Sequence, residues 1–165
     1  MKDELLKFFK TGAKDPKITV LGVGSEIKSD DGAGHYAAGR LAAKNKKNEN
    51  KNIQVLSSGT APENYTSDIK RFETTHLIII DAAETGKKPG TITLIPRKDI
   101  AGVTFSTHVL PLSVMLDYLS QSIEFETLVI GIEPEKLSFG QELTKNVDDA
   151  VNKIVSAIIE TTGGK

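Results

Sequence analysis

Short apolar runs alternate with longer segments of helical spacing along almost the whole chain. Five runs have the length and the apolar, often β-branched composition of strands: residues 18–23, 53–56, 77–80, 91–95 and 128–132. Four segments carry apolar residues at helical spacing: residues 34–44, 63–72, 111–119 and 147–159. Strands and helices in this order predict βαβ units with right-handed crossovers, and therefore an α/β fold.

The predicted sheet is mostly parallel, with one strand that runs against the others. Residues 77–80 are apolar on both faces, which is typical of a central parallel strand covered by helices on each side. Residues 91–95 alternate Thr with Ile or Leu and follow a short, turn-rich link at 86–90, which favours an antiparallel neighbour. We therefore expect a three-layer α/β/α sandwich with a five-stranded, mostly parallel sheet and one antiparallel strand.

The length and composition limit the domain count and the partners. A chain of 165 residues fits one domain, which we divide into a leader helix at 1–16 and an α/β core at 17–162. The absence of cysteine excludes thiolate metal sites and a cysteine nucleophile. The 21 basic and 22 acidic residues nearly balance, so we expect no nucleic-acid partner and no membrane partner. The polar segment 44–52 lacks interleaved aromatic residues and is interpreted as a solvated helix end and loop.

The first ten residues mix charges of both signs and hold no apolar run of the length that a signal peptide or membrane span needs. We therefore expect a cytoplasmic protein, and we expect a monomer.

Acidic and imidazole side chains follow the predicted strands at several places. Asp30 and Asp31 come shortly after the first strand, Asp81 directly follows the third, and His108 lies in a later loop. In open α/β sheets, ligands collect at the carboxyl ends of the strands, where these side chains could meet. Two carboxylates and an imidazole at one edge would form a divalent metal site or an acid–base site.

Each of these residues also has an ordinary structural interpretation. Asp30 or Asp31 could cap the helix that follows, because Asp accepts N–H bonds in a first turn. Asp81 could accept amide hydrogen bonds from a loop, and His108 could be bonded to the backbone. These interpretations stay open at the level of the residues alone.

Other polar features are interpreted as structural. The glycine-rich loop at 22–32 resembles a dinucleotide-binding loop, but Ile27 stands where the third glycine would be needed, and the following aspartates would repel a pyrophosphate. His35 and His76 are expected to be structural or surface residues. Residues 133–135 are interpreted as a solvated turn in preference to a lining of the same sheet edge.

Seven ordered motifs carry a resemblance to a known family. They are VLGVG at 20–24, DDGAG at 30–34, GTAPEN at 59–64, LIIIDA at 77–82, THVLPL at 107–112, GIEP at 131–134 and DDAV at 148–151. In this order they resemble the hydrogenase maturation endopeptidases, and among them the subgroup that processes the large subunit of hydrogenase-3-type NiFe hydrogenases. The resemblance runs from about residue 18 to residue 159.

The resemblance implies that Asp31, Asp81 and His108 are the catalytic and metal-contacting residues. The family removes a C-terminal extension from the NiFe hydrogenase large-subunit precursor after nickel insertion. The implied partner is therefore the nickel-loaded precursor, which supplies the Ni²⁺, and other divalent ions could substitute for it in crystals. Two carboxylates and one imidazole suit a borderline divalent ion. Our hypothesis for the reaction is attack of an activated water on the scissile carbonyl carbon.

Three residues, at two places in the chain, depart from the pattern of that family. Ser57 and Ser58 stand where the family commonly has a Gly-Gly pair, and Ser25 stands where Asn often follows the Gly-x-Gly. Because glycine lets a peptide approach closely, the serine pair predicts a narrower or stiffer cleft and an altered choice of precursor.

Two other functions fit part of the pattern. A receiver-like signalling module would hold Mg²⁺ at the acidic cluster and accept a phosphoryl group on Asp81. Against it, Asp30 and Asp31 lie beyond the strand tip, and His108 would have no role. The other is a catalytically inactive relative that only binds the precursor.

Overall fold

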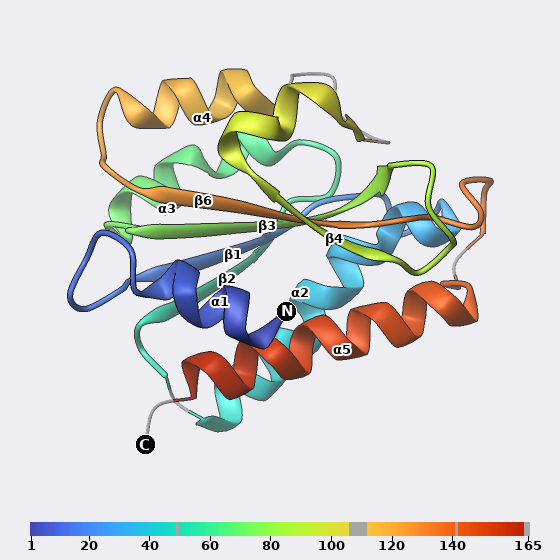
Figure 1. The fold of residues 1–165 in the computed structure, drawn as a ribbon, viewed down its shortest axis with the longest axis horizontal. Helices are drawn as coiled ribbons and strands as arrows, with labels where there is room; N and C mark the ends of the chain where they lie inside the picture. Colours follow the sequence, from blue (N-terminus) through green and yellow to red (C-terminus); the bar gives the residue numbers. More distant parts are fainter. Residues whose placement is uncertain (49, 106–111, 141, 164–165) are drawn as a thin grey trace.

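The computed structural model describes residues 1–48, 50–105, 112–140 and 142–163, and within them a mixed sheet lies between two layers of helices (Figure 1). The α-helices are α1 (Lys2–Phe9), α2 (Ala33–Asn48), α3 (Thr66–Arg71), α4 (Leu112–Ser120) and α5 (Lys145–Thr162). Short 3₁₀ helices are η1 (Ser29–Gly32), η2 (Pro62–Tyr65) and η3 (Arg97–Gly102). The strands are β1 (Ile18–Gly22), β2 (Ile53–Ser57), β3 (His76–Glu84), β4 (Ile92–Pro96), β5 (Thr104–Phe105) and β6 (Glu126–Ile132).

The sheet has the order β2-β1-β3-β6-β4, and β5 pairs with the end of β3. Strands β2, β1, β3 and β6 are parallel to one another, whereas β4 runs antiparallel to β6. The predicted α/β/α fold, its central strand and its antiparallel strand are confirmed. The structure adds β5, which the sequence did not predict because a pair of two residues leaves no periodic pattern.

Alternate residues of the central strand face two separate cores. Ile78 and Ile80 of β3 point into a core that is closed by α1, α2 and α5. Leu77 and Ile79 point into the opposite core, which is closed by α3, α4 and η3. Figure 1 shows these two helical layers on either side of the sheet. Each fully buried aliphatic side chain contributes about 1.5–3 kcal/mol, so both faces of β3 hold the layers together.

The leader helix is short and belongs to the first core. The prediction placed a leader helix at 1–16, whereas α1 ends at Phe9. Its apolar side, Leu5 and Phe9, is buried, and both phenylalanines at its end contact the ring of His76. Helix α1 thus covers the amino end of the sheet next to α5.

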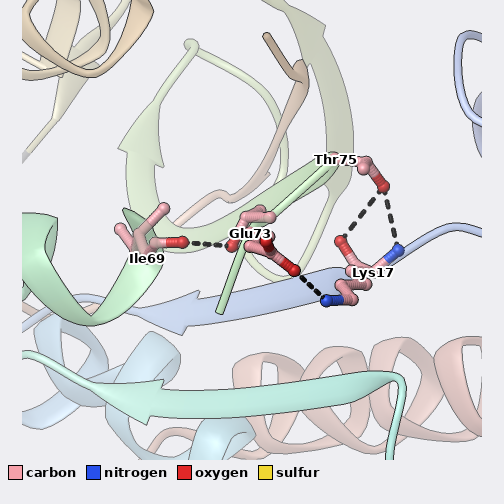
Figure 2. A network of polar contacts seen from close by, with 5 residues as sticks. Lys17, Ile69, Glu73 and Thr75 are labelled. Carbon is pink, nitrogen blue, oxygen red and sulfur yellow. Dashed lines mark hydrogen bonds and ion pairs between the residues drawn. The ribbon is translucent and has the colours of Figure 1, made fainter. Parts of the chain in front are cut away.

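Polar contacts join the amino ends of β1 and β3, as Figure 2 shows. The Lys17 amide donates to Oγ1 of Thr75 over 2.9 Å, and the Thr75 amide donates to the Lys17 carbonyl over 2.9 Å. The exposed ion pair between Lys17 and Glu73 adds little, because solvent screens such pairs. These hydrogen bonds set the register of β1 and β3, and the register determines which residues lie at the carboxyl ends of the two strands.

Candidate functional site

The strand register places Asp81 at the carboxyl edge of the sheet. Gly22, the last residue of β1, pairs with Ile80 of β3, and the Val23 amide donates to the Ile80 carbonyl over 2.9 Å. Asp81 is therefore the first residue of β3 beyond the end of β1. This is the edge at which open α/β sheets bind ligands.

Glycines allow η1 and α2 to sit directly on the tips of β1 and β3. A Cβ atom at Gly34 would overlap the Ile80 carbonyl and the backbone of Val23. Gly24 has a φ of +127°, and a Cβ there would overlap the carbonyl of Asp31. Side chains at these two positions would push the acidic turn away from the sheet.

Asp31 lies in η1 and is only 1% exposed. Its Oδ2 accepts a hydrogen bond from the Ser25 amide over 3.0 Å, which closes the loop between β1 and η1. Since η1 contacts β3, the Asp31 carboxylate is held on an element adjacent to the strand that carries Asp81.

Asp81 is fully buried, with 0% exposure. The prediction that it ends the third strand is wrong, because β3 continues to Glu84. Asp81 pairs with Gly131 of β6, and the residues after it pair with β6 and then with β5. Burying a carboxylate is costly, so two buried acids on adjacent elements at one edge are typical of a functional site.

His108 lies outside the described residues, so its predicted place beside the two acids stays a prediction. Within the residues that the structure describes, no group of three or more His, Cys, Asp and Glu side chains is arranged to hold a metal ion. The described part of the predicted set is therefore the pair Asp31 and Asp81, whose oxygen donors suit a divalent ion that brings further ligands of its own.

Asp30 has a different role from the helix capping that the sequence suggested. It is 0% exposed, and its carboxylate accepts hydrogen bonds from the amides of Glu135, Lys136 and Thr144 over 2.7–2.9 Å. The Thr144 hydroxyl donates a further bond over 2.9 Å. Asp30 thus fastens the loop between β6 and α5 to the acidic turn. No sequence pattern predicts this role, because the donors come from a loop far along the chain.

Glu133 is not in a solvated turn, as the sequence had suggested, but is 8% exposed. Its Oε2 accepts bonds from the Thr85 amide over 2.7 Å and from the Thr85 hydroxyl over 2.6 Å. Burial raises the pKa of Glu133, but hydrogen bonds from the Thr85 hydroxyl and from the amides of residues 85–87 outweigh it, so the pKa lies below its ordinary value. The ionised carboxylate therefore holds the turn after β3.

The two described histidines differ in their surroundings. His76 is fully buried against α1, with Nε2 lying 3.0 Å from the Thr11 carbonyl, and burial lowers its pKa. His35 lies on α2 with Nδ1 2.9 Å from the Ser57 hydroxyl and Nε2 3.2 Å from the carboxylate of Glu26. The structural interpretation of both is confirmed, and His35 links the first loop to the end of β2.

The serine pair that departs from the family pattern makes side-chain hydrogen bonds at the end of β2, and its effect on the cleft stays a prediction. Ser57 contacts His35, and Ser58 is 8% exposed. Both the amide and the hydroxyl of Ser58 donate to the Gly22 carbonyl, over 2.9 and 3.2 Å. A glycine at either position could make no side-chain bond of this kind.

The fold is that of an α/β/α protein, and its acidic edge is a candidate binding or catalytic site at the carboxyl ends of parallel strands. None of its described helices has the length and apolar character needed to cross a membrane. The family model described as hydrogenase maturation protease, HycI, matches residues 36–161. The chain belongs to the hydrogenase maturation protease family, as its motifs predicted, and its activity is that of a peptidase.

Individual relatives agree with this assignment. The hydrogenase 3 maturation protease of Escherichia coli strain K12 is 36% identical over 136 residues, which covers 82% of this chain and 84% of the relative. The solution structure of the endopeptidase HycI from Escherichia coli has a TM-score of 0.74 and 34% identity, and the match covers 90% of this chain and 94% of that one.

A more distant structure reproduces the fold over nearly the full length. The crystal structure of a NiFe hydrogenase maturation protease, HycI, from Thermococcus kodakarensis KOD1 matches with a TM-score of 0.86 and 23% identity. The match covers 98% of this chain and 99% of that one. Membership of a protease family does not favour the receiver-like signalling module.

Proposed function

We propose that this protease removes the C-terminal extension of a NiFe hydrogenase large-subunit precursor after nickel has been inserted. The observation that carries the proposal is the pair of buried carboxylates, Asp31 at 1% and Asp81 at 0% exposure, on adjacent elements at the carboxyl edge. His108 completes the proposed set of side chains that contact the nickel of the precursor.

The residue types suit recognition of a metal that arrives with the substrate. Ionised carboxylates and a neutral imidazole bind a borderline divalent ion through oxygen and nitrogen, and the absence of cysteine leaves the thiolate ligands to the precursor. A precursor without nickel would lose these contacts and would not be held in the cleft. Two acids and one histidine therefore make cleavage depend on prior metal insertion.

The reaction is hydrolysis of one peptide bond in the held precursor. The oxygen of a water molecule bonds to the scissile carbonyl carbon, the C–N bond breaks, and a proton passes to the departing amine. The side chains of Asp31 and Asp81 hold the precursor so that this bond lies at the sheet edge.

Incubation with purified large-subunit precursor tests the proposal. We expect release of the extension from nickel-loaded precursor, seen as a mass loss by mass spectrometry, and no release from nickel-free precursor. Asp31→Asn, Asp81→Asn and His108→Ala should each reduce cleavage at least about a hundredfold, because loss of a group that only supports a metal ligand already costs about 10- to 100-fold. Equal cleavage of the two precursors would overturn the nickel dependence. Wild-type rates in the three variants would overturn the site.

Precursor that binds but is never cleaved would identify the inactive relative considered above. A binding measurement beside the cleavage assay therefore separates that alternative from an active peptidase.

A further inference from the structure

Two loops that are far apart in sequence run side by side next to the acidic turn. The Gly140 amide donates to the Ile27 carbonyl over 3.0 Å, and the Ser29 amide donates to the Gly140 carbonyl over 2.6 Å. Lys28 and Gly140 form a parallel β-bridge between the same loops. We call residues 25–28 and 136–140 together the two-loop rim.

Hydrogen bonds to two buried polar side chains hold the rim in place. The Asp30 carboxylate accepts its four hydrogen bonds from residues 135, 136 and 144, and the Ser29 hydroxyl donates to the Glu142 carbonyl over 2.8 Å. Charge-assisted bonds to a buried carboxylate are among the stronger hydrogen bonds in proteins. The two loops are thus held in one arrangement, as a preorganised binding surface requires.

The rim carries the two most exposed large apolar side chains of the described residues. Phe139 is 76% exposed and Ile27 is 51% exposed. The ammonium of Lys28 lies 5.8 Å from the centre of the Phe139 ring, within the range of a cation–π contact. The paired backbones keep these two apolar residues on neighbouring segments.

The position of the rim indicates what it meets. Ile27 and Asp31 belong to the same loop and turn, which the Ser25 amide closes on the Asp31 carboxylate. A protein substrate whose scissile bond reaches Asp31 therefore approaches the segment that also carries Ile27. The rim is continuous along the chain with the site proposed above at Asp31.

The area of the rim argues against a stable complex between two copies of this chain. A phenylalanine buries about 150–250 Å² and an isoleucine less, whereas a stable complex needs about 800 Å² per partner. Two exposed anchors next to a catalytic edge fit a transient enzyme–substrate contact with a small number of strong contact residues.

We propose that the two-loop rim docks the hydrogenase precursor by burying Phe139 and Ile27 under an apolar patch of its folded body, beside the cleaved extension. This inference rests on the proposed function, because it assigns the precursor as substrate. The rim thereby adds to the affinity for the precursor, while the acidic edge contacts the nickel and positions the scissile bond.

The test compares Phe139→Ala, Ile27→Ala and the double variant with the wild type in precursor cleavage. We expect KM to rise about ten- to hundredfold in Phe139→Ala with kcat unchanged, a smaller rise in Ile27→Ala, and near recovery in Phe139→Leu. The matched control is Leu6→Ala on α1, where Leu6 is 42% exposed and lies away from the rim. Its KM should equal that of the wild type.

Binding of the precursor, measured by biolayer interferometry, separates this inference from the proposed function. Weaker binding of the precursor to Phe139→Ala than to the wild type supports docking by the rim, whether or not cleavage is seen. If the wild type does not cleave the precursor, the proposed function fails while docking by the rim stands. If the wild type cleaves the precursor, and Phe139→Ala has the same KM and binds the precursor equally well, the proposed docking by the rim is overturned and the proposed function stands. Sedimentation that shows a wild-type dimer lost in Phe139→Ala would make the rim a self-interface and also overturn it.

Discussion

Replacing Gly34 with alanine tests how closely α2 must approach the sheet. The added Cβ would overlap the Ile80 carbonyl oxygen and both the carbonyl oxygen and the amide nitrogen of Val23. These are backbone atoms, which cannot rotate away as a side chain would. Helix α2 would therefore have to move off the sheet by on the order of 1 Å to restore ordinary contact distances. Overpacking costs about 1–3 kcal/mol or more, and with backbone on both sides we expect a loss of about 3 kcal/mol.

The matched control lies on the same helix. A Cβ at Gly39 meets no atom within 4 Å, so Gly39→Ala should gain the ordinary helix preference of alanine, about 0.5–1 kcal/mol. The free energy of unfolding should thus be about 3 kcal/mol lower than the wild type in Gly34→Ala and about 1 kcal/mol higher in Gly39→Ala, a difference of roughly 4 kcal/mol between the two variants. Urea denaturation followed by circular dichroism measures both values in one set of conditions.

The same substitution should affect the site. Because η1 leads directly into α2, a shift of the helix moves Asp31 relative to Asp81, and we expect Gly34→Ala to lose precursor cleavage under conditions where it is still folded. Equal unfolding midpoints for Gly34→Ala and Gly39→Ala would refute the close approach. Full cleavage by a destabilised Gly34→Ala would refute its link to the site.

Three further predictions follow from buried polar groups. Asp30→Asn should cost about 3–5 kcal/mol, because the amide that replaces the carboxylate cannot accept all four bonds, and amide exchange at residues 135, 136 and 144 should accelerate. Because burial lowers the pKa of His76, its imidazole binds a proton more readily in the unfolded chain than in the folded chain. The free energy of unfolding should therefore fall as pH drops below 6.5, and His76→Gln should weaken this dependence in urea denaturation. Glu133→Gln should cost about 1.5–3 kcal/mol at neutral pH. Because the pKa of Glu133 is lowered, that difference should be present above pH 4.5 and should vanish as pH falls through the lowered value.

Each of these predictions has a result that would contradict it. The exposed Asp15→Asn is the control for Asp30→Asn, and similar losses in both would remove the special role of the buried carboxylate. An unchanged pH dependence in His76→Gln would show that another group dominates the loss below pH 6.5. A stability gap for Glu133→Gln that persists in acid would exclude the ionised carboxylate as its cause.

The site was predictable from sequence only in part. Asp31 and Asp81 were identified because acids after apolar, β-rich runs point to the carboxyl edge of a sheet, and the structure places both there, buried and on adjacent elements. The role of His108 rests on the family resemblance. Asp30 was interpreted as a cap, and the contacts that show otherwise come from residues 135–144.

The sequence by itself determined the layered fold, since side chains alternate along a strand and recur every three to four residues on a helix, and both periods are local. The tertiary structure alone decided the rest: that β3 continues past Asp81 to pair with β5, that Glu133 holds the turn at Thr85, and that Asp30 ties the two-loop rim together. These contacts join segments far apart along the chain. A buried carboxylate accepts whichever donors the folded loops bring to it, and only the folded structure shows which donors those are.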